Sequence, residues 1–189
     1  MPGLVVFFIV LAVLAMFGVF IFNQLVALKH NVGKAWSNID ILLKQRHDEL
    51  PKLVETCKQY MQYEQETLER VMKARAAVSS AREKGDVGAL GPAESELRIG
   101  LGNLFAVAEA YPQLKANETF QHLQTRISGL ENSIADRREF YNEAVNNNNV
   151  RIEQFPDLVV ARLFAFRIAD LLEFGEEEKK DVDLKALFS

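Results

Sequence analysis

The residues best suited to metal or acid–base chemistry in this sequence are its three histidines, His30, His47 and His122. A helical bundle can hold a di-iron centre when Glu-x-x-His motifs face its interior, because carboxylates and imidazoles then meet in pairs. No glutamate stands three residues before any of these histidines. The sequence therefore predicts neither this metal centre nor a bound cofactor.

The single cysteine, Cys57, is the next candidate for chemistry. A catalytic thiol needs a nearby base and electropositive surroundings. Cys57 falls between Leu53 and Tyr60 on an apolar helix face, and the adjacent Lys58 points to another face, so we expect a small buried side chain. The sequence also lacks a G-x-S-x-G motif and a phosphate-binding glycine loop. These observations favour a protein that is not an enzyme.

Polar residues on or beside the apolar helix faces are the remaining candidates for a site. One interpretation makes them a ligand or partner site. The other makes them paired polar layers that fix the alignment of the helices, because buried charges are normally paired. We favour the second interpretation. The predicted polar layer of the bundle contains Glu64, Arg75, Glu109, Asn117, Glu131, Arg138 and Asn142.

Composition excludes two classes of protein. The 189 residues include 22 basic and 26 acidic side chains, for a net charge of −4. A nucleic-acid-binding protein would show a basic face, so we expect no nucleic-acid partner. One cysteine supports neither a disulfide framework nor a zinc cluster. Residues 170–189 hold seven acidic residues and three lysines, which predicts an acidic flexible tail over residues 175–189.

The N-terminus carries an apolar run, Leu4 to Phe22, without a polar side chain. Its length suits the hydrocarbon core of a bilayer. A cleaved signal peptide is the alternative, but the run exceeds the usual core of about 7–15 residues and no A-x-A site follows it. We therefore expect a transmembrane anchor over residues 1–24, with the lipid bilayer as its partner. Lys29, Lys34 and Lys44 follow the run, so the positive-inside rule places the C-terminal domain in the cytoplasm.

Beyond the anchor, apolar residues keep the spacing of a helix. Steps of three and four, without a breaker, predict that the anchor helix continues into the next domain. Pro51 either kinks this helix or begins the next one, and the apolar spacing then resumes from Leu53 to Ala81. The first series contains Leu25, Leu28, Val32, Ala35, Ile39 and Leu42.

Three helix boundaries follow from glycine, proline and asparagine. The glycines and the proline in residues 85–92 predict a connection between helices. A third helix ends near Pro112, and Asn117 is expected to cap a fourth, which reaches about Gln154 before Pro156. Short connections make neighbouring helices antiparallel. The predicted fold is all-α, with the transmembrane helix continuous with an antiparallel up-and-down bundle of long helices over residues 25–156.

Residues 157–174 form an apolar C-terminal segment that also carries charges. It can dock on the bundle, lie on the membrane surface or contact a neighbouring subunit. We favour docking, because an apolar helix face most often packs locally. The candidate residues for a subunit contact are Phe155, Leu158, Leu163, Phe164 and Phe166.

The sequence contains six strings in a definite order and spacing: AWSNID (35–40), LLKQRHDELPKLVETCKQY (42–60), YEQETLERVMKAR (63–75), VAEAYPQLKANETF (107–120), LENSIADRREFYNEAV (130–145) and FPDLVVARLFAF (155–166). Together they closely resemble the LemA family. The resemblance covers about residues 23–168 and implies a small bacterial membrane-anchored protein with an antiparallel helical bundle, without an established enzyme activity. A magnetosome-associated protein belongs to the same family. Two positions depart from the family pattern: its frequent Phe-Gly-Phe is Phe164-Ala165-Phe166 here, and Asn148 stands where a tyrosine is frequent.

Together these features favour a non-enzymatic scaffold at the bacterial inner membrane that self-associates into a homo-oligomer. The apolar helix faces and the planar confinement of an anchored protein both favour assembly. The alternative is an adaptor or regulator of a membrane-bound metalloprotease or other envelope machinery, since some members of the resembling family are encoded beside such proteases. That alternative would make another membrane protein the partner.

Overall fold

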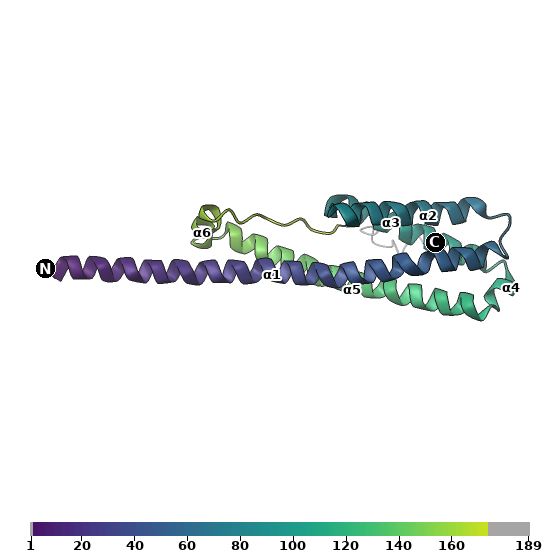
Figure 1. The fold of residues 1–189 in the computed structure, drawn as a ribbon, viewed down its shortest axis with the longest axis horizontal. Coiled ribbons are helices and arrows are strands. Elements are labelled where there is room, and N and C mark those ends of the chain that lie inside the picture. Colours follow the sequence, from purple (N-terminus) through teal and green to yellow (C-terminus); the bar gives the residue numbers. More distant parts are fainter. Residues whose placement is uncertain (1, 174–189) are drawn as a thin grey trace, which may run out of the picture. The chain divides into compact units, whose positions relative to one another are not determined.

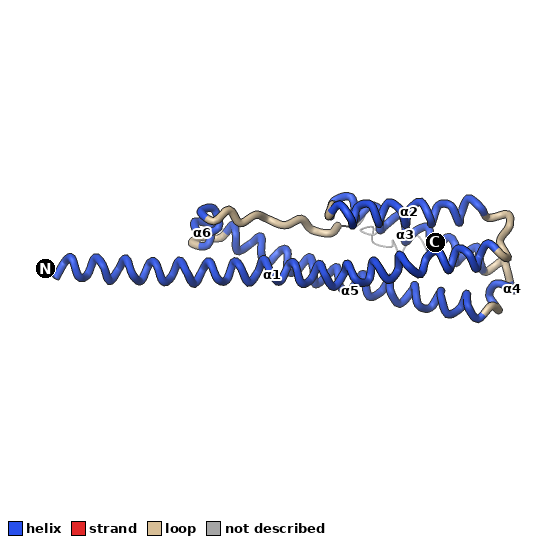
Figure 2. Tube along the Cα trace, in the orientation of Figure 1, coloured by secondary structure: helices blue, strands red, loops and turns tan. Residues whose placement is uncertain are grey.

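The computed structural model describes residues 2–173, which form six helices joined by loops. Figure 2 shows helices and loops, and no strand, across these residues. The predicted all-α fold is confirmed, whereas the predicted acidic tail over 175–189 lies outside the described residues. The helices are α1 (Pro2–Lys58), α2 (Gln65–Lys84), α3 (Val87–Ala108), α4 (Pro112–Lys115), α5 (Glu118–Glu153) and α6 (Asp157–Leu163).

Helix α1 is one continuous helix of 57 residues that contains both the apolar run and the series that follows it (Figure 1). Within the described residues it is the one helix long and apolar enough to cross a membrane. Pro51 lies inside α1 and does not end it. The neighbouring residues Leu50, Leu53 and Val54 are buried, and their packing offsets the one backbone hydrogen bond that proline removes.

The expectation of unbroken helix from Leu53 to Ala81 is wrong. Helix α1 ends at Lys58 and α2 begins at Gln65, after a turn in which the Met61 amide donates to the Cys57 carbonyl over 2.9 Å. Residues 59–64 contain no glycine or proline. The apolar spacing also stays in phase across the turn, so periodicity alone does not reveal it.

The predicted connection over residues 85–92 is much shorter than expected, because only Gly85 and Asp86 lie outside the helices. Gly85 has φ +66°, the left-handed conformation that glycine adopts without steric cost, and ends α2. The Asp86 carboxylate accepts a hydrogen bond of 2.9 Å from the Ala89 amide and so caps α3. Pro92 therefore lies inside α3, where the sequence predicted a loop.

The chain folds as two compact units, and α1 and α5 contribute to both. The first unit contains residues 2–38 and 137–171. The second contains residues 39–136 with residues 172 and 173.

The second unit is an antiparallel bundle built from α2, α3, the C-terminal part of α1 and the N-terminal part of α5 (Figure 1). Gly100 of α3 faces Val71 of α2, where a Cβ would lie 3.5 Å from Val71 Cγ2, so these two helices approach closely. Asn117 caps α5 as predicted, because its Oδ1 accepts a 3.0 Å hydrogen bond from the Phe120 amide. Fully buried side chains from all four helices include Ile39, Leu43, Leu53, Leu68, Val71, Leu97, Leu104, Phe120 and Ile127.

The first unit has a separate apolar core made by α1, α5 and α6. Ile21 and Leu25 of α1 pack with Ile152 of α5 and Ala161 of α6. Trp36 and Tyr141 extend the contact between α1 and α5, with ring centroids 5.6 Å apart. This core therefore includes Ile21, a residue of the apolar run itself.

After α6 the chain continues without a helix through residue 173, and we call residues 164–173 the strap. In the first unit the Asn149 side chain holds the strap from α5: its Nδ2 donates to the Ala169 carbonyl and its Oδ1 accepts from the Ala169 amide, both over 2.9 Å. The Tyr141 hydroxyl donates to the Asp170 carbonyl over 2.9 Å. In the second unit the Glu173 carbonyl lies against Gly91 of α3, at the place where a Cβ would stand.

Because the strap backbone occupies the space beside Gly91, Gly91→Ala should force the two apart. We expect a loss of about 1–3 kcal/mol in the free energy of unfolding, as for other overpacked sites. Gly102→Ala is the matched control, since Gly102 lies in the same helix with nothing within 4 Å of its added Cβ. That control should be neutral or stabilise the helix by up to about 1 kcal/mol. Urea unfolding in detergent, followed by far-ultraviolet circular dichroism, measures both, and equal effects would contradict the close approach.

Candidate functional site

The most deeply buried charged group in the second unit is the guanidinium of Arg46 on α1, which is 1% exposed. Its Nη2 donates to Glu94 Oε1 on α3, and its Nη1 donates to Glu131 Oε1 on α5. Glu94 is also buried, whereas Glu131 is partly exposed. We call these three residues the Arg46 cluster. It connects three helices through one side chain.

Two opposing effects act on the Arg46 guanidinium. Burial alone lowers its pKa, because water no longer solvates the charge, but the adjacent Glu94 and Glu131 carboxylates outweigh this and raise the pKa above its usual value. The side chain is therefore charged at every accessible pH. Its Nε has no hydrogen-bond partner among the described residues.

The surroundings of the Arg46 cluster leave little room for a ligand. A cavity of about 40 Å³ lies beside the two carboxylates, lined by Glu94, Glu131, Asn132 and Ile134 among others. This space is enough for about one water molecule and too small for a substrate. The cluster is therefore suited to holding helices together.

Sequence reasoning found Glu131 and missed its two partners, Arg46 and Glu94. A signal for both was present. Arg46 stands seven residues after Ile39 and seven before Leu53, at the heptad spacing of α1, and Glu94 stands seven residues before Leu101 on α3. A charged residue at such a core position must be paired, so the spacing itself identifies candidates for a buried ion pair.

The other predicted members of the polar layer have separate partners. Glu64 accepts a 3.4 Å hydrogen bond from the Tyr111 hydroxyl. Asn117, besides capping α5, donates through Nδ2 to the Tyr60 hydroxyl over 3.2 Å. Glu109 pairs with Lys115 in an exposed contact. Arg138 and Asn142 belong to the first unit, where both are half-buried.

Arg75 of α2 contacts His47 of α1. Its Nε donates to the His47 carbonyl over 2.9 Å, and its Nη2 lies 2.6 Å from His47 Nε2. A guanidinium only donates, so this geometry requires that Nε2 accept and that the imidazole be neutral. Burial, together with the Arg75 charge, lowers the pKa of His47 below its usual range.

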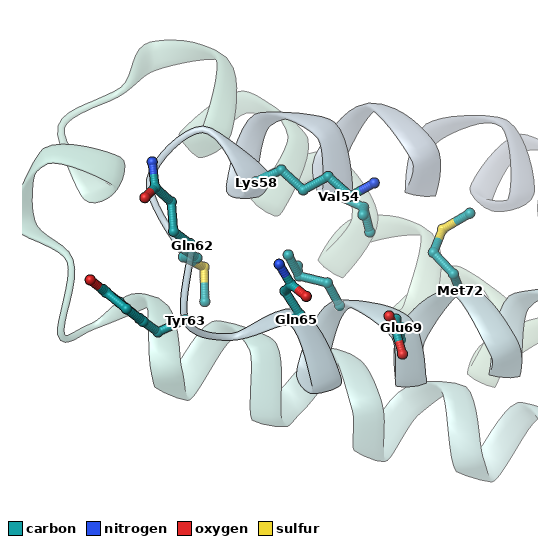
Figure 3. A pocket seen from close by; sticks show the side chains of 9 residues that line it. Val54, Lys58, Gln62, Tyr63, Gln65, Glu69 and Met72 are labelled. Atoms are coloured by element: carbon teal, nitrogen blue, oxygen red, sulfur yellow. The ribbon is translucent and has the colours of Figure 1, made fainter.

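An open pocket of about 830 Å³ lies where α1 ends and α2 begins (Figure 3). Val54, Met61, Leu68 and Met72 give it apolar walls. Its lining contains no histidine, cysteine or serine, and Glu69 is its one acidic residue. The pocket thus offers apolar surface for binding without a nucleophile paired to a base.

Cys57 is fully buried in the second unit, and burial raises the pKa of its thiol to about 12. The thiolate, which is the reactive form, is therefore absent at neutral pH. Within residues 2–173, no group of His, Cys, Asp and Glu side chains is arranged to hold a metal ion.

In the first unit, the residues predicted as a subunit contact fall into two groups. Phe166 and Leu158 are half-buried, and the Phe166 ring packs on Phe22 with centroids 5.7 Å apart. Phe155, Leu163 and Phe164 are largely exposed. The Phe164 ring nevertheless contacts Phe22 along one edge, with centroids 4.7 Å apart.

These features define a class of protein: a helical bundle whose first helix carries an exposed apolar run long enough to cross a membrane. The chain belongs to the LemA family, whose family model matches residues 35–185. The family resemblance found in the sequence is thus confirmed.

Two named relatives illustrate the similarity. Protein LemA of Metamycoplasma hominis is 28% identical over 194 residues, covering 98% of this chain and 86% of the relative. Magnetosome protein MamQ 2 of Paramagnetospirillum magneticum is 35% identical over 92 residues, covering 47% of this chain. The match spans only 34% of the MamQ 2 length. Neither name denotes an enzyme.

The Arg46 cluster should contribute strongly to stability, because Arg46→Ala leaves two carboxylates without their shared cation. We expect a loss of about 3–5 kcal/mol in the free energy of unfolding. Arg70→Ala is the matched control, since Arg70 pairs with Glu96 over 2.8 Å while both side chains are 49% exposed. That exposed pair should contribute at most about 1 kcal/mol. Urea unfolding compares the two variants, and similar losses would refute the importance of burial.

His47 should make the second unit less stable in mild acid. The unfolded chain binds a proton at His47 near pH 6.5, whereas the native state, with its lowered pKa, takes up that proton only at lower pH. The free energy of unfolding therefore decreases as the pH falls through that window. In His47→Gln the decrease between about pH 7.5 and about pH 5.5 should be smaller than in the unmodified chain. Equal decreases would show that His47 does not contribute.

Proposed function

We propose that this protein is a non-enzymatic, membrane-anchored helical scaffold that self-associates at the bacterial inner membrane. The apolar run supports the anchor: its side chains from Leu4 to Phe20 are exposed on α1, and no element within residues 2–173 covers them. Such a surface is stable when lipid covers it. The lysines that follow the run, Lys29 and Lys34, favour a cytoplasmic location for the rest of the chain.

The observation that carries the self-association proposal is an open groove between α1 and α5 in the first unit. The groove has a volume of about 420 Å³ and is lined by Ala27, Leu28 and Val150, with polar residues at its sides. Two helices alone cover only part of each other's apolar faces, so Leu28 stays half-buried and Val150 is 41% exposed. A helix from a second copy would complete the packing.

Anchoring supports assembly through this groove. Proteins anchored in one membrane diffuse only in its plane and have the same orientation. Equivalent grooves on two copies therefore meet at a high effective concentration. Contacts of this kind close into a symmetric homo-oligomer. A non-enzymatic role is supported by the side chains that could react: the Cys57 thiol is buried and protonated, and the Arg46 cluster is closed to substrates.

The pocket at the junction of α1 and α2 favours a second candidate function, that of an adaptor. Met61 and Met72 are adaptable apolar side chains, and the neighbouring Tyr63 is 93% exposed. A peptide segment of another membrane protein, such as a metalloprotease, would find apolar surface and an aromatic side chain there (Figure 3).

Native mass measurement of the gently solubilised full-length protein tests the scaffold. We expect a discrete multiple of 21.4 kDa. A photo-crosslinking residue at Val150 should join two copies of the chain, whereas the same residue at Ile99, which is similarly exposed at 39% but lies on α3, should not. A monomer, or a complex in which each copy binds a different membrane protein, would overturn the scaffold and support the adaptor.

A further inference from the structure

We propose that α6 and its flanking residues form a foot, residues 155–168, that inserts apolar side chains into the membrane interface beside the anchor. The proposal rests on the anchor in the proposed function and is independent of self-association. Its ligand is the lipid bilayer itself, contacted at the level where hydrocarbon meets headgroups.

The first argument is depth. The apolar run from Leu4 to Phe22 has 19 residues, and at about 1.5 Å per residue it spans about 28 Å. The hydrocarbon core is about 30 Å thick, so the whole run is needed to cross it. Its last residues, Ile21 and Phe22, must then lie at the boundary between hydrocarbon and headgroups.

The foot covers α1 at this same level. Ile21 is only 4% exposed, because Ile152 and Ala161 pack against it. The Phe22 ring contacts the rings of Phe164 and Phe166, with centroid distances of 4.7 and 5.7 Å. Elements that bury the last turn of the membrane-spanning run are at interface depth themselves.

The second argument is the surface that the foot presents. Its inward face holds Asp157 and Ala161, which are 4% and 1% exposed. Apart from Arg162, its outward face is apolar, where a water-facing helix would be polar. A step of four residues places Val159 and Leu163 in one row along α6. Phe155, also exposed, lies in the turn that precedes the helix. The exposed apolar side chains of the foot are Phe155, Val159, Leu163, Phe164 and Ile168.

The third argument is the position of the charges. Arg162 and Arg167 are exposed on the foot, and their long side chains can extend to lipid phosphates while the apolar row stays in the acyl region. The one buried carboxylate of α6, Asp157, is neutralised by Arg151, whose Nη2 lies 3.4 Å away. Arg151 also donates to Gln24 on α1, just past the apolar run. The foot can therefore approach lipid without burying an unpaired charge.

A second copy of the chain is the competing occupant, since some of these side chains are also candidates for a subunit contact. Depth favours lipid. Lipid surrounds the anchor at the level of Ile21 and Phe22. The outward-facing apolar row of the foot therefore contacts lipid there, and this contact needs no second copy of the chain.

The test places an environment-sensitive fluorophore at single cysteines in the full-length protein. Leu163→Cys reports on the foot. Phe140→Cys is the matched control, because Phe140 is also exposed, at 57%, and lies in the first unit next to Tyr141, which contacts Trp36. Trp36 follows Phe22 by 14 residues of one helix, or about 21 Å along α1. The unmodified chain should take up no label at its buried Cys57.

The labelled proteins are reconstituted into vesicles of phosphatidylcholine and phosphatidylglycerol that carry spin-labelled acyl chains. We expect blue-shifted emission and quenching at Leu163→Cys that is several-fold stronger than at Phe140→Cys. Equal, weak quenching at both positions would overturn the proposal. Disulfide-linked dimers of the unlabelled Leu163→Cys protein, together with an absence of quenching in the labelled protein, would also overturn it and assign the foot to a second copy.

A third label distinguishes failure of the foot from failure of the anchor. Leu11→Cys lies in the middle of the apolar run. If a deep spin label quenches Leu11→Cys but Leu163→Cys remains unquenched, the anchor stands and only the foot is refuted. If Leu11→Cys is also unquenched, the anchor itself is refuted and the foot with it.

Discussion

A guanidinium without access to water holds the second unit together. Arg46 projects from α1 and binds Glu94 on α3 and Glu131 on α5, so any slide of one helix past another would strand a buried charge. A shifted alignment of the helices therefore costs much more free energy here than it would at a purely apolar contact. We interpret the Arg46 cluster as the device that selects one alignment among the many that leucine-rich faces would tolerate.

The first unit solves the same problem by different means. Its core is apolar and contains Ile21, Leu25, Ile152 and Ala161. Apolar contacts hold helices close together but set their alignment only weakly. Alignment there comes from directional bonds at the strap. The Asn149 amide satisfies both the carbonyl and the amide of Ala169, as a neighbouring β-strand would, and so holds an irregular segment at one place on α5.

Sequence alone predicted the elements better than their boundaries. The all-α fold, the continuity of α1 beyond the apolar run and the Asn117 cap followed from spacing and capping chemistry. The turn at 59–64 was missed because the apolar spacing stays in phase across it. The loop over 85–92 was overestimated because Pro92 lies inside a helix that packing stabilises.

The candidate sites were harder to predict, because spacing identifies a core position but not the partner that meets it. Glu131 was found and Arg46 was not, although both occupy such positions. The departure from the family pattern at Ala165 was more informative. Ala165 has φ +53°, the left-handed conformation that glycine adopts readily, so the glycine that the family resemblance implies at this position would have a conformational reason.

The groups considered for chemistry and the exposed apolar side chains lie in different places in this protein. The groups considered for chemistry, Cys57 and the Arg46 cluster, are largely buried from solvent in the second unit. Apolar side chains, in contrast, are exposed along the apolar run and on α6. Exposed apolar area is costly in water and is retained where a partner or lipid covers it. This distribution supports the proposed binding role rather than a catalytic one. Ile21 belongs both to the apolar run and to the core of the first unit, so the proposed anchor and the folding of that unit share this residue.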